Sequence, residues 1–581
     1  MPDMPPHSDH RSSQSGSRTS ESSEATSGNT AMDTIQTLIV AFVLAMTFRG
    51  FVVEGFVIPT GSMAPTLLGQ HEQVYDSQTS YAFSVGWDAT RAAFGGVLVS
   101  PMLGRDIRVQ KPMEPLPRPR MGDRILVLKC LYALLNPSRW DVVVFKNPTD
   151  PLGPSANYIK RLVGLPDETL WLADGDVFTK TENRPDFAIQ RKPQDIQRDV
   201  WQLVYGSDYI PIEPDELWYV ADTQARQQFL RRNPGIERSD QGGAVRLPPG
   251  DPSLGSFSGP PWQSDPPEAW DVRQSRSYKS DGMGISRLVW DNKRMRLDDW
   301  LSYNMLSSPQ PTINVSDLRI AFDIVAQEPD GEAIVQIVAQ SHVFQFVLTK
   351  DEAIVRMRLD SDGSVWTESS APFALPEPGK SISIECWRVD QAMYLFINGS
   401  AAVEPLLYQW SPVDRLRFAT GQIDVAETDS KLYLTSIPET SLALEFSGSP
   451  MTLTHLEVSR DLYYRPVMTK SATVDRNPTP PGKEHLVGLG MPGYGTRPGR
   501  FAELGPDQFY MLGDNSMLSL DSRLWGNPAP VIAAQIDDSP YLVDRRLLIG
   551  KAFFVYFPAP LPLSRGGAGI VPNFSRLRFI R

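Results

Sequence analysis

One apolar segment constrains the whole chain, because it is long enough to enter a bilayer. Residues 35–53 carry Arg49 as their only charge, and nineteen helical residues approach the roughly 30 Å thickness of a hydrocarbon layer. Arg49 lies near one end, where its side chain can reach the interface. A cleaved signal peptide or a buried core helix would show a similar run. The acidic-leaning tail before the segment and the absence of a small-residue cleavage site after it favour a membrane anchor over 34–53.

The chain is too long for a single core. Its 581 residues imply roughly two to four domains. The expected segments are a disordered tail at 1–33, the anchor at 34–53, the first part of a β-domain at 54–189, an irregular extension at 190–312, a β-sandwich at 313–464, a Pro- and Gly-rich connector at 465–500, the second part of the β-domain at 501–560, and a basic tail at 561–581.

Composition excludes several function classes. A net charge of −12 argues against a nucleic-acid partner, because phosphate binding needs concentrated Lys and Arg. The two cysteines, Cys130 and Cys386, lie far apart and form neither a zinc-ligand pair nor a disulfide framework. We therefore expect no metal site and no cofactor.

A short stretch after the apolar segment is suited to nucleophilic chemistry. Ser62 stands next to Gly61, which leaves its hydroxyl accessible, and Thr60 places a second hydroxyl two residues earlier. Pro59 and Pro65 restrict φ on either side and stiffen the peptide. Taken alone, this stretch could also be an ordinary turn.

A lysine on a predicted strand is the candidate base. Runs rich in β-branched residues and bounded by turn residues predict strands at 125–128, 141–145 and 158–164. In the third, a period of two places Lys160 on one face with Tyr158 and Leu162. If that face packs inward, desolvation lowers the lysine pKa and yields a base near neutral pH. In the alternative, Lys160 faces solvent while Ile159 and Arg161 pack inward, and periodicity alone leaves the choice open.

A histidine base is less favoured. Of the six histidines, His71 is the nearest in sequence to Ser62. It stands outside the serine stretch, and no carboxylate beside it has an orienting role. A Ser–His pair therefore ranks below Ser62 with Lys160.

Several motifs, met in order, resemble those of type I signal peptidases. The matching stretches are 58–67, 122–124, 139–145, 158–168, 513–526 and 550–556. The two segments that contain them, 54–189 and 501–560, make up about a third of the chain. Two positions depart from the family pattern, since Trp140 and Asp167 stand where the family usually has glycine.

The resemblance implies a serine–lysine dyad on a mainly β, largely antiparallel fold. Ser62 would be the nucleophile, and Lys160 would accept its proton. The backbone N–H of Ser62 and the hydroxyl of Thr60 would form the oxyanion hole. Ser519 matches a serine that orients the lysine, and a supporting pair is formed by Asp521 and Arg523. A surface salt bridge is the alternative reading of that last pair.

The resemblance also implies a substrate and a location. Ile58, Pro59 and Ile159 match positions that wall pockets for small side chains one and three residues before the cut. The expected partners are precursor proteins with signal peptides and the lipid bilayer. The expected location is the cytoplasmic (inner) membrane, with a single span and the catalytic domain on the extracytoplasmic side.

Regularly spaced strand-like runs predict the inserted β-sandwich. They lie at 318–325, 333–338, 343–348, 353–359, 382–387, 392–397, 416–418, 432–434, 442–446 and 453–458. The pattern is similar to concanavalin-like jelly rolls, which often bind glycans or proteins, although fold does not establish a ligand. Asp360, Asp362 and Asp390 are better explained as turn carboxylates than as calcium ligands. The arginines of the basic tail would contact anionic lipid or remain solvated.

Two other functions remain open. A non-catalytic, membrane-tethered protein could act through the sandwich alone, and it predicts a separation of Ser62 from Lys160 beyond hydrogen-bond reach. A Ser–Lys protease for another substrate, such as a self-cleaving regulator, ranks last because that class usually lacks an anchor.

Overall fold

The protein is described from a computed structural model. The described residues are 25–76, 79–87, 98–103, 120–210, 218–219, 245–246, 260–272, 276–282, 284–305, 311–328, 330–360, 365–374, 377–421, 437–470, 476–562 and 569–581. The chain divides into two compact units, Met1–Glu54 and Gly55–Arg581.

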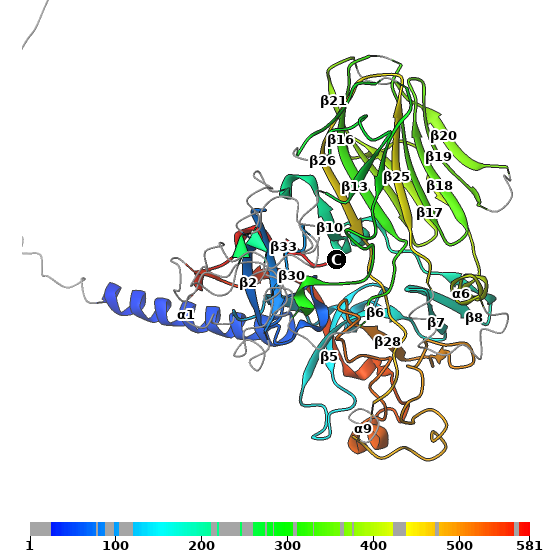
Figure 1. Ribbon diagram of the computed structural model, residues 1–581. Coiled ribbons are helices and arrows are strands. Elements are labelled where there is room, and N and C mark those ends of the chain that lie inside the picture. Colours follow the sequence, from blue (N-terminus) through cyan, green and yellow to red (C-terminus); the bar gives the residue numbers. More distant parts are fainter. Residues whose placement is uncertain are drawn as a thin grey trace, which may run out of the picture. The chain divides into compact units, whose positions relative to one another are not determined.

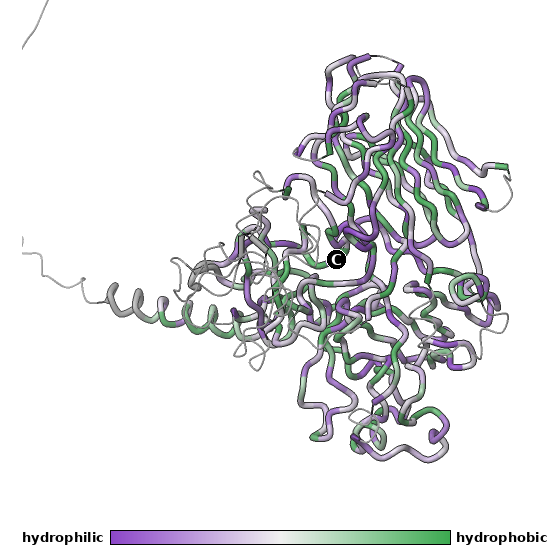
Figure 2. The backbone as a smooth tube through the Cα atoms, in the orientation of Figure 1, coloured by the Kyte–Doolittle hydropathy of each residue, from purple (hydrophilic) through white to green (hydrophobic). Residues whose placement is uncertain are grey.

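The first unit contains the helix α1 (Ala25–Phe51). Its stretch Met32–Phe51 is long and apolar enough to cross a membrane, and the hydrophobic colouring along it is visible in Figure 2. The helix begins at Ala25, inside the tail predicted to be disordered over 1–33. Residues 25–33 are therefore helical, because adding residues to an existing helix is easier than nucleating one. The rest of that predicted tail lies outside the described residues.

The second unit is built on β-sheets (Figure 1). Its first sheet runs in the order β1 (Val53–Val57), β4 (Arg124–Leu128), β30 (Leu548–Phe557), β5 (Val142–Lys146), β6 (Asn157–Gly164), β28 (Gln508–Leu512) and β29 (Val543–Asp544), with β33 (Arg578–Phe579) paired to β30. The strands predicted at 125–128, 141–145 and 158–164 are confirmed as β4, β5 and β6. β4 pairs with β30, β30 with β5, β5 with β6 and β6 with β28, and each of these pairings is antiparallel.

Two smaller sheets complete this β-domain. β2 (His71–Asp76) pairs with β3 (Tyr81–Gly86), and the other sheet runs β27 (Ala502–Glu503), β7 (Thr169–Ala173), β8 (Asp176–Thr181) and β9 (Arg184–Ile189). β28 pairs with β6, and β30 lies between β4 and β5. The domain is thus assembled from two stretches of chain, and residues 190–464 are an insertion between them.

The insertion forms a two-layer β-sandwich (Figure 1). One sheet runs β10 (Gln202–Gly206), β26 (Met451–Arg460), β16 (Leu318–Ala326), β21 (Ser381–Val389), β22 (Ala392–Ile397) and β23 (Ser400–Ala401), with β14 (Tyr278–Ser280) on β26 and β24 (Leu406–Leu407) on β22. The other runs β13 (Trp262–Asp265), β15 (Ser286–Trp290), β25 (Ser441–Ser447), β17 (Glu332–Ala339), β18 (His342–Leu348), β19 (Glu352–Leu359) and β20 (Thr367–Pro372). One apolar core draws side chains from both sheets, including Phe322 of β16 and Val335 of β17. Strict alternation of buried and partly buried residues along β17 matches the period of two.

Two expectations for this region need correction. The extension predicted as irregular over 190–312 supplies strands to both sheets, namely β10, β13, β14 and β15. These strands are short and stand between Pro-rich stretches, so they show little periodicity. The strand predicted at 416–418 lies in the helix α6 (Pro412–Thr420). Ser411 caps that helix and Gly421 ends it at φ 67°, and these capping signals outweigh a short apolar run. The strand predicted at 432–434 lies outside the described residues.

The other elements are short. They are η1 (Gly61–Met63), α3 (Leu131–Leu134), α4 (Gln194–Val200), η2 (Ser207–Tyr209), β11 (Trp218–Tyr219), β12 (Val245–Arg246), η4 (Ser302–Asn304), α9 (Pro530–Gln535), η6 (Arg545–Leu547), β31 (Leu561–Pro562), β32 (Gly569–Val571) and η7 (Phe574–Arg576).

Buried ion pairs join the insertion to the β-domain. Arg415 of α6 pairs with Asp174 and Asp176 at the β7–β8 turn. Lys192, at the start of the insertion just after β9, contacts both Asp390 and Asp461 at 2.8 Å. Breaking such a pair would leave an uncompensated buried charge. The junction is therefore a specific contact. The carboxylate of Asp390, expected in a turn, is part of it.

Candidate active site

The serine stretch is fixed at both ends by one buried aspartate, Asp123. Ser62 lies in the short 3-10 turn η1 and is partly exposed. Asp123 accepts a hydrogen bond from the backbone N–H of Leu68 at 2.9 Å, while its own carbonyl accepts from the N–H of Ile58 at 2.9 Å. The residues before and after Ser62 are thus held by the same aspartate.

Asp123 also forms an ion pair with an arginine of the predicted basic tail. Arg576 lies 3.3 Å from its carboxylate, and Arg578 donates to the carbonyl of Thr66. These two arginines contact the β-domain, so the tail is not a fully solvated or lipid-bound segment at these positions.

The structure brings Lys160 to Ser62. Its Nζ lies 2.7 Å from Oγ of Ser62 and 3.0 Å from the carbonyl oxygen of Ile159. The lysine side chain belongs to β6 and the residue is only 3% exposed. Burial lowers the Lys160 pKa to about 8, although the charges of Asp521 and Asp514 oppose the shift. About a tenth of this amine is therefore neutral at pH 7, far more than for an ordinary lysine, and this neutral form is the one that a general base needs.

The neighbouring Arg161 was not recognised as a site residue from the sequence. It is fully buried, and its Nε and Nη2 donate to the carboxylate of Asp514 at 2.8 and 2.7 Å. The hydroxyl of Thr66 donates to the same carboxylate at 2.5 Å. Asp514 therefore ties the lysine strand to the serine stretch. The sequence feature that could have indicated this ion pair is Asp514, because it belongs to the 513–526 motif.

The expected support pair is present and buried. Arg523 and Asp521 form an ion pair at 2.8 Å with both side chains fully buried, which excludes the surface alternative. Asp521 accepts from the N–H of Gly513 at 3.1 Å, and Arg523 donates to the hydroxyl of Ser516 at 2.7 Å. The pair thus fixes the loop that begins the late motif.

Ser519 lies at the site, but its hydroxyl makes no hydrogen bond to the Lys160 amine. Its Oγ is buried and has no hydrogen-bond partner among the described residues. A side chain at Gly513 would overlap both Ser519 and the carbonyl of Ser62, so the three residues are close together. The lysine-orienting role of Ser519 stays a prediction.

The other predicted residues lie around Ser62. Thr60 is exposed, and its hydroxyl makes no side-chain capping bond to η1. Ile58 is buried, and Ile159 packs against the same apolar cluster, which places the two expected pocket walls together. Pro59 is exposed. His71 is buried with Nδ1 2.7 Å from the carbonyl of Gly69, and burial lowers its pKa.

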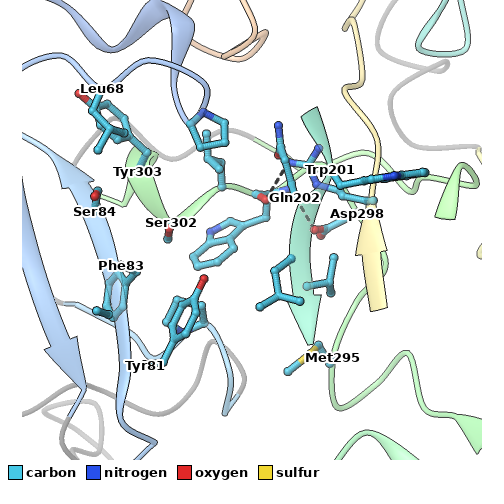
Figure 3. Close-up of a pocket in the computed structure, with 18 of the residues that line it drawn as sticks. Leu68, Tyr81, Phe83, Ser84, Trp201, Gln202, Met295, Asp298, Ser302 and Tyr303 are labelled. Atoms are coloured by element: carbon cyan, nitrogen blue, oxygen red, sulfur yellow. Dashed lines mark hydrogen bonds between the residues drawn. The ribbon is translucent and has the colours of Figure 1, made fainter. Parts of the chain in front are cut away.

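A separate cavity of about 720 Å³ borders the serine stretch (Figure 3). Pro65 and Leu68 line it, and so do residues of β3, β10 and η4. Figure 3 shows Tyr303 beside Leu68, with Gln202 in the same cavity. Neither Ser62 nor Lys160 is among its lining residues, so this cavity is distinct from the dyad.

A serine hydroxyl set against a buried lysine on a β-scaffold is the arrangement used by serine–lysine hydrolases. Comparison with known proteins points to a peptidase family that matches part of the chain. Residues 107–226 match the family model described as signal peptidase, peptidase S26. This match covers about a fifth of the chain.

Curated relatives agree with that family. Signal peptidase I of Rickettsia bellii is 24% identical over 159 residues, covering 27% of this chain and 43% of the relative. The probable signal peptidase I-2 of Synechocystis is 26% identical over 163 residues, covering 28% of this chain and 50% of the relative. The matches therefore span half or less of these relatives' own length. Together with the family match, they support a type I signal peptidase.

Solved structures resemble only part of the chain. The carbohydrate-binding module CBM66 from Bacillus subtilis is 8% identical with a TM-score of 0.21, covering 34% of this chain and 96% of that structure. A TM-score this low supports no conclusion about a ligand.

Proposed function

We propose that the protein is a membrane-anchored endopeptidase that removes N-terminal signal peptides from translocated precursor proteins. The observation that carries the proposal is the 2.7 Å separation of Lys160 Nζ from Ser62 Oγ, with the lysine buried. The non-catalytic alternative predicts a separation beyond hydrogen-bond reach, so this distance favours the enzyme.

The reaction follows from the two side chains. Neutral Lys160 accepts the proton of Ser62 as Oγ attacks the peptide carbonyl, and the resulting ammonium returns that proton to the leaving amine. The acyl group then rests as an ester on Ser62 until water, activated by the same lysine, hydrolyses it. The N–H of Ser62 and the hydroxyl of Thr60 stabilise the oxyanion. One such donor typically contributes on the order of 10²–10³ in rate.

Specificity and location complete the proposal. Ile58, Pro59 and Ile159 would admit only small side chains at the positions one and three residues before the cut, because larger ones overlap bulky apolar walls. The helix α1 would act as a single span in the cytoplasmic membrane, with the catalytic domain on the extracytoplasmic side. A glycan or protein ligand of the sandwich also remains a prediction.

The test uses the full chain in detergent and a precursor with Ala-X-Ala before the cleavage site. Ser62→Ala and Lys160→Ala are each expected to lose at least about 10³-fold in kcat, as removal of a nucleophile or its base does. Lys146→Ala is the matched control, because Lys146 belongs to the adjacent strand β5 and its amine donates to the carbonyl of Ser155 rather than to Ser62. It should retain wild-type turnover. Unchanged turnover in either dyad variant overturns the proposal.

A further inference from the structure

We propose that the insertion is part of the catalytic machinery, because its residues Tyr303 and Asn304 position the backbone on which Ser62 stands. The inference rests on the proposed role of Ser62 as nucleophile. Both positioning residues belong to η4, which lies in the stretch expected to be an irregular extension. None of the motifs that resemble signal peptidases includes this segment.

Tyr303 packs directly on the residue before the nucleophile. A Cβ added to Gly61 would overlap the Tyr303 ring, so the ring covers that α-carbon. Tyr303 is 5% exposed and shares an apolar cluster with Ala64 and Leu68, on the other side of Ser62 in sequence. Its hydroxyl donates to the carbonyl of Gln70 at 3.0 Å. The aromatic ring thus contacts the serine stretch both before and after the nucleophile.

Asn304 acts through a second asparagine. The side-chain amides of Asn304 and Asn515 exchange two hydrogen bonds of 2.8 Å, each donating Nδ2 to the other's Oδ1. Asn515 also donates Nδ2 to the carbonyl of Gly61 at 3.0 Å, and its backbone N–H donates to the carbonyl of Ser62 at 3.1 Å. Asn304 therefore sets the orientation of the amide that holds the nucleophile's backbone.

This bracing matters because the nucleophile stands on a three-residue 3-10 turn that is partly exposed. Such a turn has few hydrogen bonds of its own. A displacement of about 1 Å at a reacting atom can cost on the order of 10² in rate, so contacts that fix Gly61 and Ser62 act on kcat. Asn304 and Tyr303 do not touch the substrate under this proposal, and KM should change little.

The first experiment is a double-mutant cycle between Asn304→Ala and Asn515→Ala on the full chain with the precursor assay. Each single variant is expected to lower kcat about 10- to 100-fold with KM within about twofold. The double variant should be no slower than Asn515→Ala, since under this proposal Asn304 reaches the backbone of Gly61 and Ser62 through Asn515. Independent, multiplying losses in kcat, or an unchanged kcat in Asn304→Ala, overturns the proposal.

Two further variants separate positioning from general destabilisation. Tyr303→Phe keeps the ring and should stay within about threefold of wild-type kcat, whereas Tyr303→Ala should fall about 10-fold or more. Val335→Ala removes buried apolar volume from the sandwich core. It should lower Tm while leaving kcat unchanged; a matching loss of kcat would mean that the Tyr303 and Asn304 variants act only through stability, which overturns the proposal.

If Ser62→Ala retains turnover, the proposed function fails. If Ser62→Ala is inactive and the Asn304 cycle is additive, only this inference fails.

Discussion

Arg161 forms a two-point ion pair with Asp514, and both side chains are fully buried. Arg161 directly follows the candidate base, Lys160, in the sequence. The pair joins β6 to the late motif, and the hydroxyl of Thr66 attaches the serine stretch to the same carboxylate. Three stretches of chain that are distant in sequence therefore meet at one aspartate.

Removing this arginine should be costly. Arg161→Met leaves the Asp514 carboxylate buried without its partner, and we expect a loss of about 3–5 kcal/mol in the free energy of unfolding. The measurement is chemical denaturation of the full chain in detergent. Arg417→Met is the control, because Arg417 pairs with Asp414 at the surface, where such pairs contribute about 0–1 kcal/mol. Equal losses in the two variants would contradict a structural role for the buried pair.

The two departures from the family pattern have a backbone explanation. Trp140 has φ 76° and Asp167 has φ 61°, in the left-handed region that favours glycine. Asp167 is exposed, so Asp167→Gly should change the unfolding free energy by less than about 1 kcal/mol. Trp140 is buried, and Nζ of Lys192 lies 5.1 Å from its ring centroid. Trp140→Gly should therefore destabilise by about 3–5 kcal/mol despite relieving the backbone. Equal thermal stability of Trp140→Gly and wild type would show that the ring contributes nothing at this junction.

The candidate base should reduce stability while it is charged. Its folded pKa of about 8 lies below the unfolded value of about 10.4, so the folded protein binds fewer protons between these two pH values. Lys160→Met should raise the unfolding free energy by about 3 kcal/mol below pH 8. The gain should shrink as pH rises from 8 and vanish above 10.4, where both states carry a neutral amine. Denaturation at pH 7 and pH 10 measures this difference. A gain that does not depend on pH would mean that the lysine is not perturbed in the folded state.

Much of the β-domain was predictable from local pattern. β4, β5 and β6 stand out because β-branched runs are bounded by turn residues, and the candidate pair Ser62 and Lys160 stands within motifs that resemble those of type I signal peptidases. The face of Lys160 was not predictable, because β6 is buried on both sides: Arg161 is as inaccessible as its neighbour. A period of two distinguishes faces only where one of them is solvated.

Contacts that depend on the tertiary fold could not be predicted from the sequence. Nothing local marks Tyr303 or Asn304, since their partners are more than two hundred residues away. Likewise, the short apolar run 416–418 predicts a strand by itself, but it belongs to the helix α6, which the cap at Ser411 starts. Short strands such as β14 become strands only by pairing with a long neighbour, β26.

The pH dependence of kcat/KM tests the central claim most directly, because it reports the ionisation of the free enzyme's essential base. If Lys160 is that base, kcat/KM for precursor cleavage should rise about tenfold per pH unit and level off above an apparent pKa of about 8. A profile that is flat from pH 6 to 9, or one that levels off near the ordinary histidine pKa of about 6.5, would contradict a lysine base at this site.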